Sequence, residues 1–162
     1  MNETIQSVLG ILARHHITYT LVEHIPVYTI DEIAALHLPN SHTIAKNLFI
    51  RDDKKKHYYV VVIEQTKTVN LKELRKTLKT RPLSFASESD LWNYMKLTKG
   101  AVTPLGILND DTRTVTVIID SYFKNGYITV HPNDNTASVC MASSDLISLL
   151  QNHGNAVIIT DL

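Results

Sequence analysis

The chain has 162 residues, of which 44% are hydrophobic and 20% are charged, and its formal net charge is zero. This length suits one domain, and the composition excludes the hydrophobic-poor, highly charged signature of a disordered chain. No run approaches the roughly 20 apolar residues of a membrane span, and the start lacks the pattern of a secretory signal, so we expect a cytoplasmic protein. Cys140 is the single cysteine, which excludes an intrachain disulfide and a cysteine-rich zinc or redox site.

The amino-terminal part of the chain carries two helix signals separated by a strand signal. Apolar residues at three- and four-residue spacing predict an amphipathic helix over Glu3–His15, and alternation predicts a strand over Thr18–Glu23. Thr29 and Glu32 have the Thr-x-x-Glu form of a capping box, in which each end satisfies a free backbone donor of the other. A short helix through Leu36 should follow.

The middle of the chain predicts a hairpin followed by two short helices. Two apolar, β-branched and aromatic runs, Ile44–Arg51 and Tyr58–Ile63, are joined by a charged tip. Asn70 is typical of a helix N-cap and predicts a helix through Leu78, whose basic side chains project outward. Ser87 similarly predicts a helix through Met95.

The carboxy-terminal part reads mainly as strands. Strands are predicted over Val115–Ile119, Tyr127–Val130 and Ser138–Met141, followed by a helix over Ser143–Gln151 and a terminal strand over Ala156–Ile159. Strand runs with helices inserted irregularly, rather than a regular βαβ alternation, favour an α+β fold. We therefore expect a single domain over residues 1–162, with a mixed, curved β-sheet and helices packed around it.

Positive charge is concentrated between Lys46 and Arg81. This segment has 11 Lys and Arg against 4 Asp and Glu, a local charge of +7, and the two flanking segments are negative. Such a block could hold a polyphosphate partner through charge neutralisation and counterion release. A solvated hairpin tip and helix face would explain the charge alone more simply. The side chains concerned are Arg51, Lys54, Lys55, Lys56, Lys72, Arg75, Lys76, Lys79 and Arg81.

Several chemistries lack their sequence signature. The chain has no G-x-G-x-x-G, no phosphate-binding P-loop and no H-E-x-x-H, and no histidine pair has ligand-like spacing. No G-x-S-x-G presents a serine nucleophile, and Cys140 lies in an apolar strand that favours a buried, inert thiol. We therefore expect no metal and no cofactor, and if the protein is a hydrolase we expect water to be the nucleophile.

Five motifs in order along the chain resemble a known family. They are Glu23-His24-x-Pro26-Val27-Tyr28-Thr29, Ala45-Lys46-Asn47-Leu48-Phe49-Ile50-Arg51-Asp52, Leu83-Ser84-Phe85-Ala86-Ser87, Gly100-x-x-x-Pro104-Leu105-Gly106 and His131-Pro132-Asn133-x-Asn135-Thr136-Ala137-Ser138. Together they resemble the prolyl-tRNA editing family, and within it the free-standing deacylases that clear alanine from mischarged proline tRNA. The resemblance extends from about Ile5 to Ile159. It departs at Thr68 and Asn70, where relatives tend to carry basic and acidic residues, and this leaves the contacts to the tRNA backbone open.

The resemblance implies the family's α+β fold, a trans-editing role in translation fidelity, and hydrolysis of an aminoacyl ester by water without a metal. The partner would be the acceptor end of aminoacyl-tRNA, and a transient contact with prolyl-tRNA synthetase is left open. We expect a monomer that does not bind membranes. The implied catalytic residues are Lys46, Gly100, Pro104 and His131. The implied substrate-binding residues are Asn47, Ala101, Val102, Thr103, Asn109 and Asn135, and the implied tRNA-binding residues are Arg51, Lys72, Arg75 and Lys76.

Physical roles can be suggested for these residues. Gly100 can accept an unusual φ and Pro104 fixes φ, so the loop between them could aim its carbonyls and amides at a small ligand, although alone it would be an ordinary turn. Lys46 lies in an apolar strand, and its ammonium must reach water, a carboxylate or an anionic ligand such as the terminal phosphate or ribose. Asn47 should point to the opposite strand face, so it reaches the site through an irregularity or is structural.

His131 could hydrogen-bond the ribose or a water, and its near-neutral pKa suits proton transfer, with a core or capping role as the alternative. The hypothesis requires Lys46, His131 and the segment Gly100–Pro104 to meet in one pocket. Two rival functions remain. The substrate could be another mischarged tRNA, such as cysteinyl-tRNA(Pro), or the chain could be a non-catalytic tRNA-binding module.

Overall fold

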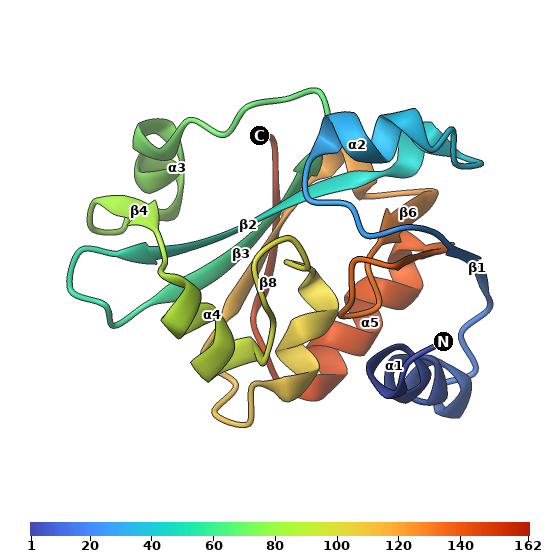
Figure 1. Cartoon of the computed structure of the whole chain (residues 1–162). Coiled ribbons are helices and arrows are strands. Elements are labelled where there is room, and N and C mark those ends of the chain that lie inside the picture. The colour runs from blue at the N-terminus through green and yellow to red at the C-terminus, as the bar shows by residue number, and fades with distance from the viewer.

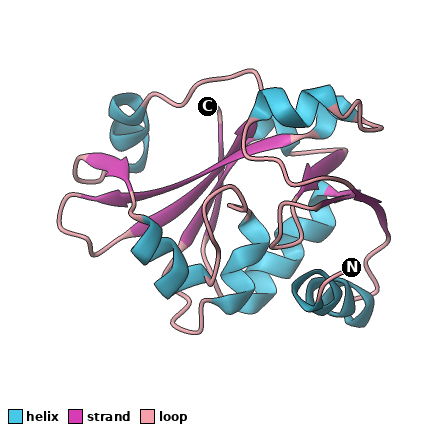
Figure 2. Ribbon diagram, viewed as in Figure 1, coloured by secondary structure: helices cyan, strands magenta, loops and turns pink.

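Eight strands form two sheets in the computed structural model, which describes residues 1–162 (Figures 1 and 2). The larger sheet contains β2 (Ala45–Asp52), β3 (Tyr58–Glu64), β4 (Leu83–Phe85), β5 (Thr116–Asp120) and β8 (Val157–Thr160), in the order β4-β2-β3-β5-β8. It is mixed, because β2 pairs antiparallel with β3 and β4 whereas β5 pairs parallel with β3 and β8.

The smaller sheet is antiparallel and has the order β1-β7-β6, formed by β1 (Tyr19–Glu23), β6 (Tyr127–Val130) and β7 (Ala137–Ala142). An isolated bridge between Ile44 and Thr129 connects the two sheets just before β2 begins. The predicted α+β class and mixed pairing are confirmed. The strands divide into two open sheets, however, rather than the single curved sheet that we expected.

Five α-helices surround the sheets: α1 (Glu3–Arg14), α2 (Ile30–Ala35), α3 (Leu71–Leu78), α4 (Glu88–Met95) and α5 (Ser143–His153). Short 3-10 helices cover Ser41–Thr43, Pro104–Asn109 and Ser121–Phe123. None of the helices combines the length and the apolar content that a membrane crossing requires.

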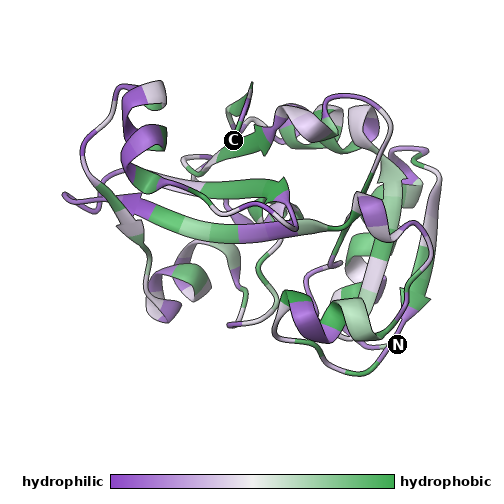
Figure 3. Ribbon diagram, turned by 90° about the horizontal axis from the view of Figure 1, so that it is seen from above, coloured by the Kyte–Doolittle hydropathy of each residue, from purple (hydrophilic) through white to green (hydrophobic).

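The larger sheet is covered on both faces. The main core packs α1, α4, α5 and the 3-10 helix Pro104–Asn109 against one face and against the smaller sheet. On the other face, Leu74 of α3 contacts a second cluster that includes Ile50 and Val61. The strands are accordingly mostly hydrophobic, while the helices alternate hydrophobic and hydrophilic sides (Figure 3). Strands buried on both faces need near-continuous apolar runs, which β3 and β5 provide.

The helix starts follow the predicted capping residues. The Thr29 hydroxyl accepts a hydrogen bond from the Glu32 N–H at 3.1 Å, and the Glu32 carboxylate accepts one from the Tyr28 N–H at 3.1 Å. The reciprocal bond therefore reaches one residue further back than in the usual capping box. Asn70 caps α3 and Ser87 caps α4, as predicted.

Strand β4 and the three 3-10 helices were not predicted. Strand β4 has only three residues after Pro82, too few for an alternation pattern, and it is defined by its pairing with Ile50–Asp52 of β2. Pro104, which we expected at the end of a loop, lies in the first turn of a 3-10 helix that extends to Asn109. A proline is tolerated there because its missing N–H would have had no partner within the helix.

Candidate active site

A cavity of about 170 Å³ lies where α2, the start of β2, the Gly100 loop and the end of β6 meet. We call it the β2-edge pocket. Lys46, Gly100 and His131, which are far apart in the sequence, all line it. The complete lining is Val27, Tyr28, Thr29, Ile30, Ile33, Ala45, Lys46, Asn47, Gly100, Val102 and His131.

Neighbouring residues Lys46 and Asn47 both reach the pocket although the strand is regular. The β2–β3 register is continuous from Ala45 to Arg51, so no irregularity turns Asn47 toward the pocket. Strand β4 pairs only with Ile50–Asp52, which leaves the first residues of β2 with an open edge opposite β3. A cavity against a strand edge can be lined by side chains from both faces of the strand. This explains why Lys46 and Asn47 line the same pocket although neighbouring side chains of a strand point to opposite faces.

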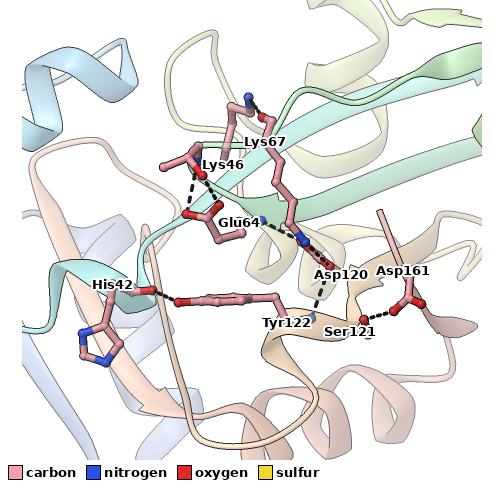
Figure 4. A network of polar contacts seen from close by, with 9 residues as sticks. His42, Lys46, Glu64, Lys67, Asp120, Ser121, Tyr122 and Asp161 are labelled. Atoms are coloured by element: carbon pink, nitrogen blue, oxygen red, sulfur yellow. Dashed lines mark hydrogen bonds and ion pairs between the residues drawn. The ribbon is translucent and has the colours of Figure 1, made fainter.

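The ammonium of Lys46 is held by a main-chain oxygen. Its Nζ donates a hydrogen bond to the carbonyl of Lys67 (Figure 4). The side chain of Lys67 in turn binds both carboxylate oxygens of Asp120, at 3.1 and 2.9 Å. None of the ion pairs in the structure includes Lys46. Lys46 therefore keeps an uncompensated positive charge and further N–H donors for an anionic or oxygen-rich ligand.

Asp120 fixes the loop that provides this carbonyl. Its carboxylate is fully buried and also accepts hydrogen bonds from the main-chain N–H groups of Glu64, at 3.1 Å, and Tyr122, at 3.2 Å. The Tyr122 hydroxyl donates to the His42 carbonyl at 2.9 Å, which ties the same network to the segment before β2 (Figure 4). A buried carboxylate saturated by donors is rigid. Asp120 therefore fixes the Lys67 side chain, and the Lys67 carbonyl in turn positions the Lys46 ammonium.

Asn47 presents an unsatisfied acceptor at the pocket. Its side-chain oxygen is buried and has no hydrogen-bond partner. Leaving a buried acceptor unpaired typically costs about 1–3 kcal/mol, so such atoms are uncommon and call for an explanation. Among the pocket-lining residues, only Asn47 has such an atom. The fold therefore leaves one acceptor of the pocket wall without a partner of its own.

Gly100 is required by backbone conformation and by space. Its φ is +88°, in the left-handed region, and a Cβ at this position would lie 2.5 Å from Cδ1 of Tyr28. Ala101 and Thr103 of the same loop are buried, and the Thr103 hydroxyl donates to the His131 carbonyl at 2.7 Å. Pro104 is buried as well and does not line the pocket. The loop is therefore attached directly to the strand end that carries His131.

His131 is held as a neutral acceptor. Its Nδ1 donates to the Ala137 carbonyl at 2.8 Å, and because a carbonyl can only accept, the free lone pair is on Nε2. Burial lowers the pKa of His131 below its usual value of 6.5, and the nearby His24, with ring centroids 6.1 Å apart, adds to this, while the Ala137 carbonyl opposes it. The imidazole can therefore accept a proton or a hydrogen bond at neutral pH.

Four predicted substrate-binding residues do not line the pocket: Ala101 and Thr103, which are buried in the loop, and the two asparagines Asn109 and Asn135. Asn135 donates from Nδ2 to the Val27 carbonyl at 2.9 Å and accepts from the Val27 N–H at its own carbonyl at 3.2 Å, so it supports the pocket wall. Asn109 donates to the Met95 carbonyl at 3.0 Å and secures the end of α4. Both side chains are occupied by the fold.

The predicted tRNA-binding residues divide between two faces. Lys72, Arg75 and Lys76 are exposed on α3, where Lys76 forms a solvent-exposed ion pair with Glu73 at 3.4 Å. We call these three the α3 basic face. Arg51 shares a strand face with Phe49 in the main core, whereas α3 covers the opposite face. Arg51 is therefore not part of the α3 basic face.

Sequence reasoning missed the apolar wall of the pocket. This wall comes mainly from the segment Val27–Ile33, with Ala45 and Val102 completing it. The motif from Glu23 to Thr29 pointed to this segment, but nothing in its local pattern showed that α2 would lie against the open edge of β2. That placement depends on contacts of Ile33 with Val27 and Ile44.

Comparisons with known proteins agree with this architecture. Residues 24–149 match the family model described as "Aminoacyl-tRNA editing domain". The chain is 44% identical over 151 residues to the prolyl-tRNA editing protein ProX of Acetoanaerobium sticklandii, covering 93% of this chain and 92% of that protein. It is 32% identical over 154 residues to the prolyl-tRNA synthetase associated domain-containing protein 1 of Bos taurus, covering 91% and 89% of the two chains.

A solved structure shares the fold. It is described as "a putative trans-editing enzyme for prolyl tRNA synthetase", and it superposes with a TM-score of 0.76 at 18% identity, covering 100% of this chain and 98% of that one. At this identity the likeness is one of fold, and it extends over the whole chain.

Proposed function

The chain belongs to the aminoacyl-tRNA editing domain family, and from this premise we propose that it is a trans-editing deacylase that removes alanine from mischarged proline tRNA. Its relative ProX is named a prolyl-tRNA editing protein, which supports a hydrolase acting on mischarged tRNA(Pro). The whole of residues 1–162 would form the editing domain, and aminoacyl-tRNA would be its substrate and main partner.

The observation that carries this function is the combination of polar groups in the β2-edge pocket. An uncompensated ammonium, a buried amide oxygen without a partner and a neutral imidazole line one small cavity. An aminoacyl-adenosine end offers a matching set of groups: a phosphate and ribose oxygens, an α-ammonium, and hydroxyl or water protons. The four other main cavities do not combine these groups.

Each group then has a role in ester hydrolysis. The Asn47 oxygen accepts a hydrogen bond from the substrate's α-ammonium, and Lys46 binds the terminal phosphate or ribose. Main-chain groups of the Gly100–Val102 loop hold the reacting carbonyl. His131 Nε2 accepts a hydrogen bond from the attacking water or the ribose hydroxyl. Water adds to the carbonyl carbon, and the bond to the ribose oxygen breaks to give a free amino acid and an intact tRNA end.

The nucleophile in this scheme is water. Thr29 is the only hydroxyl residue that lines the pocket besides the tyrosine at its rim, and its oxygen already accepts the capping hydrogen bond of α2. Positioning of water and stabilisation of the developing oxyanion together lower the barrier by several kcal/mol in well-built sites. The aminoacyl ester is intrinsically labile, so its hydrolysis needs little further catalysis.

The apolar wall supports a small aliphatic amino acid as the substrate. Val27, Ile30, Ile33, Ala45 and Val102 surround a volume of about 170 Å³ and offer no polar partner for a side chain. Excluding a larger side chain by steric contact is easier than rejecting a smaller one, so a pocket that accepts alanine can exclude proline. Cysteine is the nearest competitor in size.

The direct test compares purified protein acting on alanyl-, cysteinyl- and prolyl-tRNA(Pro). We expect alanyl-tRNA(Pro) to be hydrolysed fastest, and faster turnover of the cysteinyl form would change the assigned substrate. The Lys46→Ala variant should lose about 10- to 100-fold in kcat/KM, the effect of one hydrogen bond to a charged group. Lys124→Ala, at an exposed lysine outside the basic block and the pocket, is the matched control. Wild-type protein that binds these tRNAs but hydrolyses none would favour a non-catalytic binding module.

A further inference from the structure

Tyr28 is the aromatic residue of the β2-edge pocket. It lies at the rim and exposes 64% of its surface. An aromatic ring exposed to this extent is solvated unfavourably, and at the mouth of a pocket such rings commonly mark a binding surface. Its hydroxyl forms no hydrogen bond within the protein, so the ring itself is the feature that the fold presents.

The backbone that carries this ring is fixed on three sides. The Tyr28 N–H donates to the Glu32 carboxylate at 3.1 Å, and the preceding Val27 is bound through its N–H and its carbonyl to Asn135. One edge of the ring packs over Gly100, where any Cβ would collide with it. The hydrogen bonds fix the backbone that carries the ring, and the packing over Gly100 restricts the ring itself, which lowers the ordering cost of stacking a planar group on it.

We propose that Tyr28 is the stacking platform for the terminal adenine of the tRNA. This inference rests on the proposed function, because the ester to be cleaved is attached to the ribose of that nucleotide. With the aminoacyl group in the cavity and the ribose at its mouth, the base must lie on the rim. Lys46, on the β2 side, faces the phosphate, and Tyr28, on the α2 side, faces the base. Stacking of a base on an aromatic side chain requires no further hydrogen bonds from the protein.

The test uses two ligands that cannot be hydrolysed. One is alanine joined by an amide to 3′-amino-3′-deoxyadenosine, and the other is alanine joined to the same amino sugar without a base. Wild-type protein should bind the adenosine form about tenfold more tightly, within the range measured for one base–aromatic stack. Tyr28→Ala should abolish this preference, whereas Tyr28→Phe should keep it. Tyr127→Ala, at a tyrosine that is 62% exposed on β6 and outside the pocket, is the matched control.

Two results would overturn the platform: no preference for the adenosine form in the wild type, or an undiminished preference in Tyr28→Ala with its circular dichroism spectrum unchanged. The proposed catalysis is tested separately by hydrolysis of mischarged tRNA(Pro). A Tyr28-dependent preference in a protein that hydrolyses no mischarged tRNA would leave the platform standing and reject the deacylase. Hydrolysis at the wild-type rate by Tyr28→Ala, with equal binding of both ligands by all variants, would support the deacylase and reject the stacking platform.

Discussion

The β2-edge pocket and the α3 basic face both present basic side chains, but the fold treats them differently. In the pocket, the Lys46 ammonium is held by the Lys67 carbonyl, whose own side chain binds the buried Asp120, and the His131 ring is held by the Ala137 carbonyl. On α3, Lys72 and Lys76 are exposed, and the single ion pair of Lys76 is a solvent-screened contact within the helix. Exposed pairs of this kind contribute little to stability.

The difference separates two kinds of recognition. A few rigid groups around a small cavity can discriminate between substrates and act on a bond, because their geometry is set before binding. Flexible exposed charges can attract a polyanion from any direction, but they carry no positional information. We therefore expect substitutions in the pocket to change the rate of hydrolysis, and substitutions on α3 to change tRNA affinity and its dependence on salt.

The largest effect is expected for Gly100→Ala, with Gly126→Ala as its control. Both glycines have positive φ, +88° and +84°, so each substitution should cost about 1 kcal/mol of folding stability through the backbone. Only at Gly100 would the new methyl group collide with another residue, Tyr28, since nothing lies within 4 Å at Gly126. Gly100→Ala should lower kcat/KM about 100-fold or more, because displacement of positioned groups by about 1 Å has effects of this size. Equal activity of the two variants would show that the Gly100 loop is an ordinary turn and not part of the catalytic pocket.

A second prediction concerns the support beneath Lys46. Asp120→Asn should lower kcat/KM about tenfold, because the neutral amide holds Lys67 less firmly and the Lys67 carbonyl positions the Lys46 ammonium. The loss should disappear when the substitution is made in the Lys46→Ala background, as a double-mutant cycle would show. Additive losses would mean that Asp120 acts through stability alone. Asp53→Asn, which removes an exposed ion pair with Arg81, is the control.

The α3 basic face should give a smaller effect of a different kind. Lys72→Ala combined with Lys76→Ala should weaken tRNA binding about three- to tenfold near physiological salt and reduce the slope of log K against log salt by up to about 2. The rate constant of a single turnover at saturating protein should stay unchanged. Arg14→Ala with Lys124→Ala removes the same charge from other surfaces and should leave both quantities alone. An unchanged salt slope in the α3 variant would show that this face is only solvated.

The smallest effect concerns pH, and it sharpens the comparison because α3 carries permanent charges whereas His131 does not. The folded pKa of His131 lies below the unfolded value of about 6.5, so the unfolded state binds more protons as the pH falls through this region. The contribution of His131 to stability is therefore fully present above about pH 6.5 and declines below it. Nuclear magnetic resonance should show neutral His131, with the proton on Nδ1, still predominant at pH 6.5. A midpoint above 6.5 would contradict the buried, neutral acceptor.

Local signals accounted for most of the secondary structure. The capping residues Thr29, Asn70 and Ser87 fixed three helix starts, because a side-chain oxygen that satisfies free N–H groups acts over only three residues. The β2–β3 hairpin followed from two apolar runs and a charged tip. Strand β4 escaped prediction because its pairing with β2 depends on a partner about 30 residues away.

By itself the sequence determined the α+β class, the helix starts and, through motifs in a fixed order, the set of Lys46, Gly100 and His131. Only the tertiary structure decided how these residues meet. The short β4 leaves the start of β2 as an open edge, α2 packs beside that edge, and Thr103 attaches the Gly100 loop to the end of β6. These are long-range contacts, which no local periodicity encodes. Because of these contacts, Asn47 lines the pocket although strand alternation predicted that it would point to the opposite face, and Tyr28 lies at the rim.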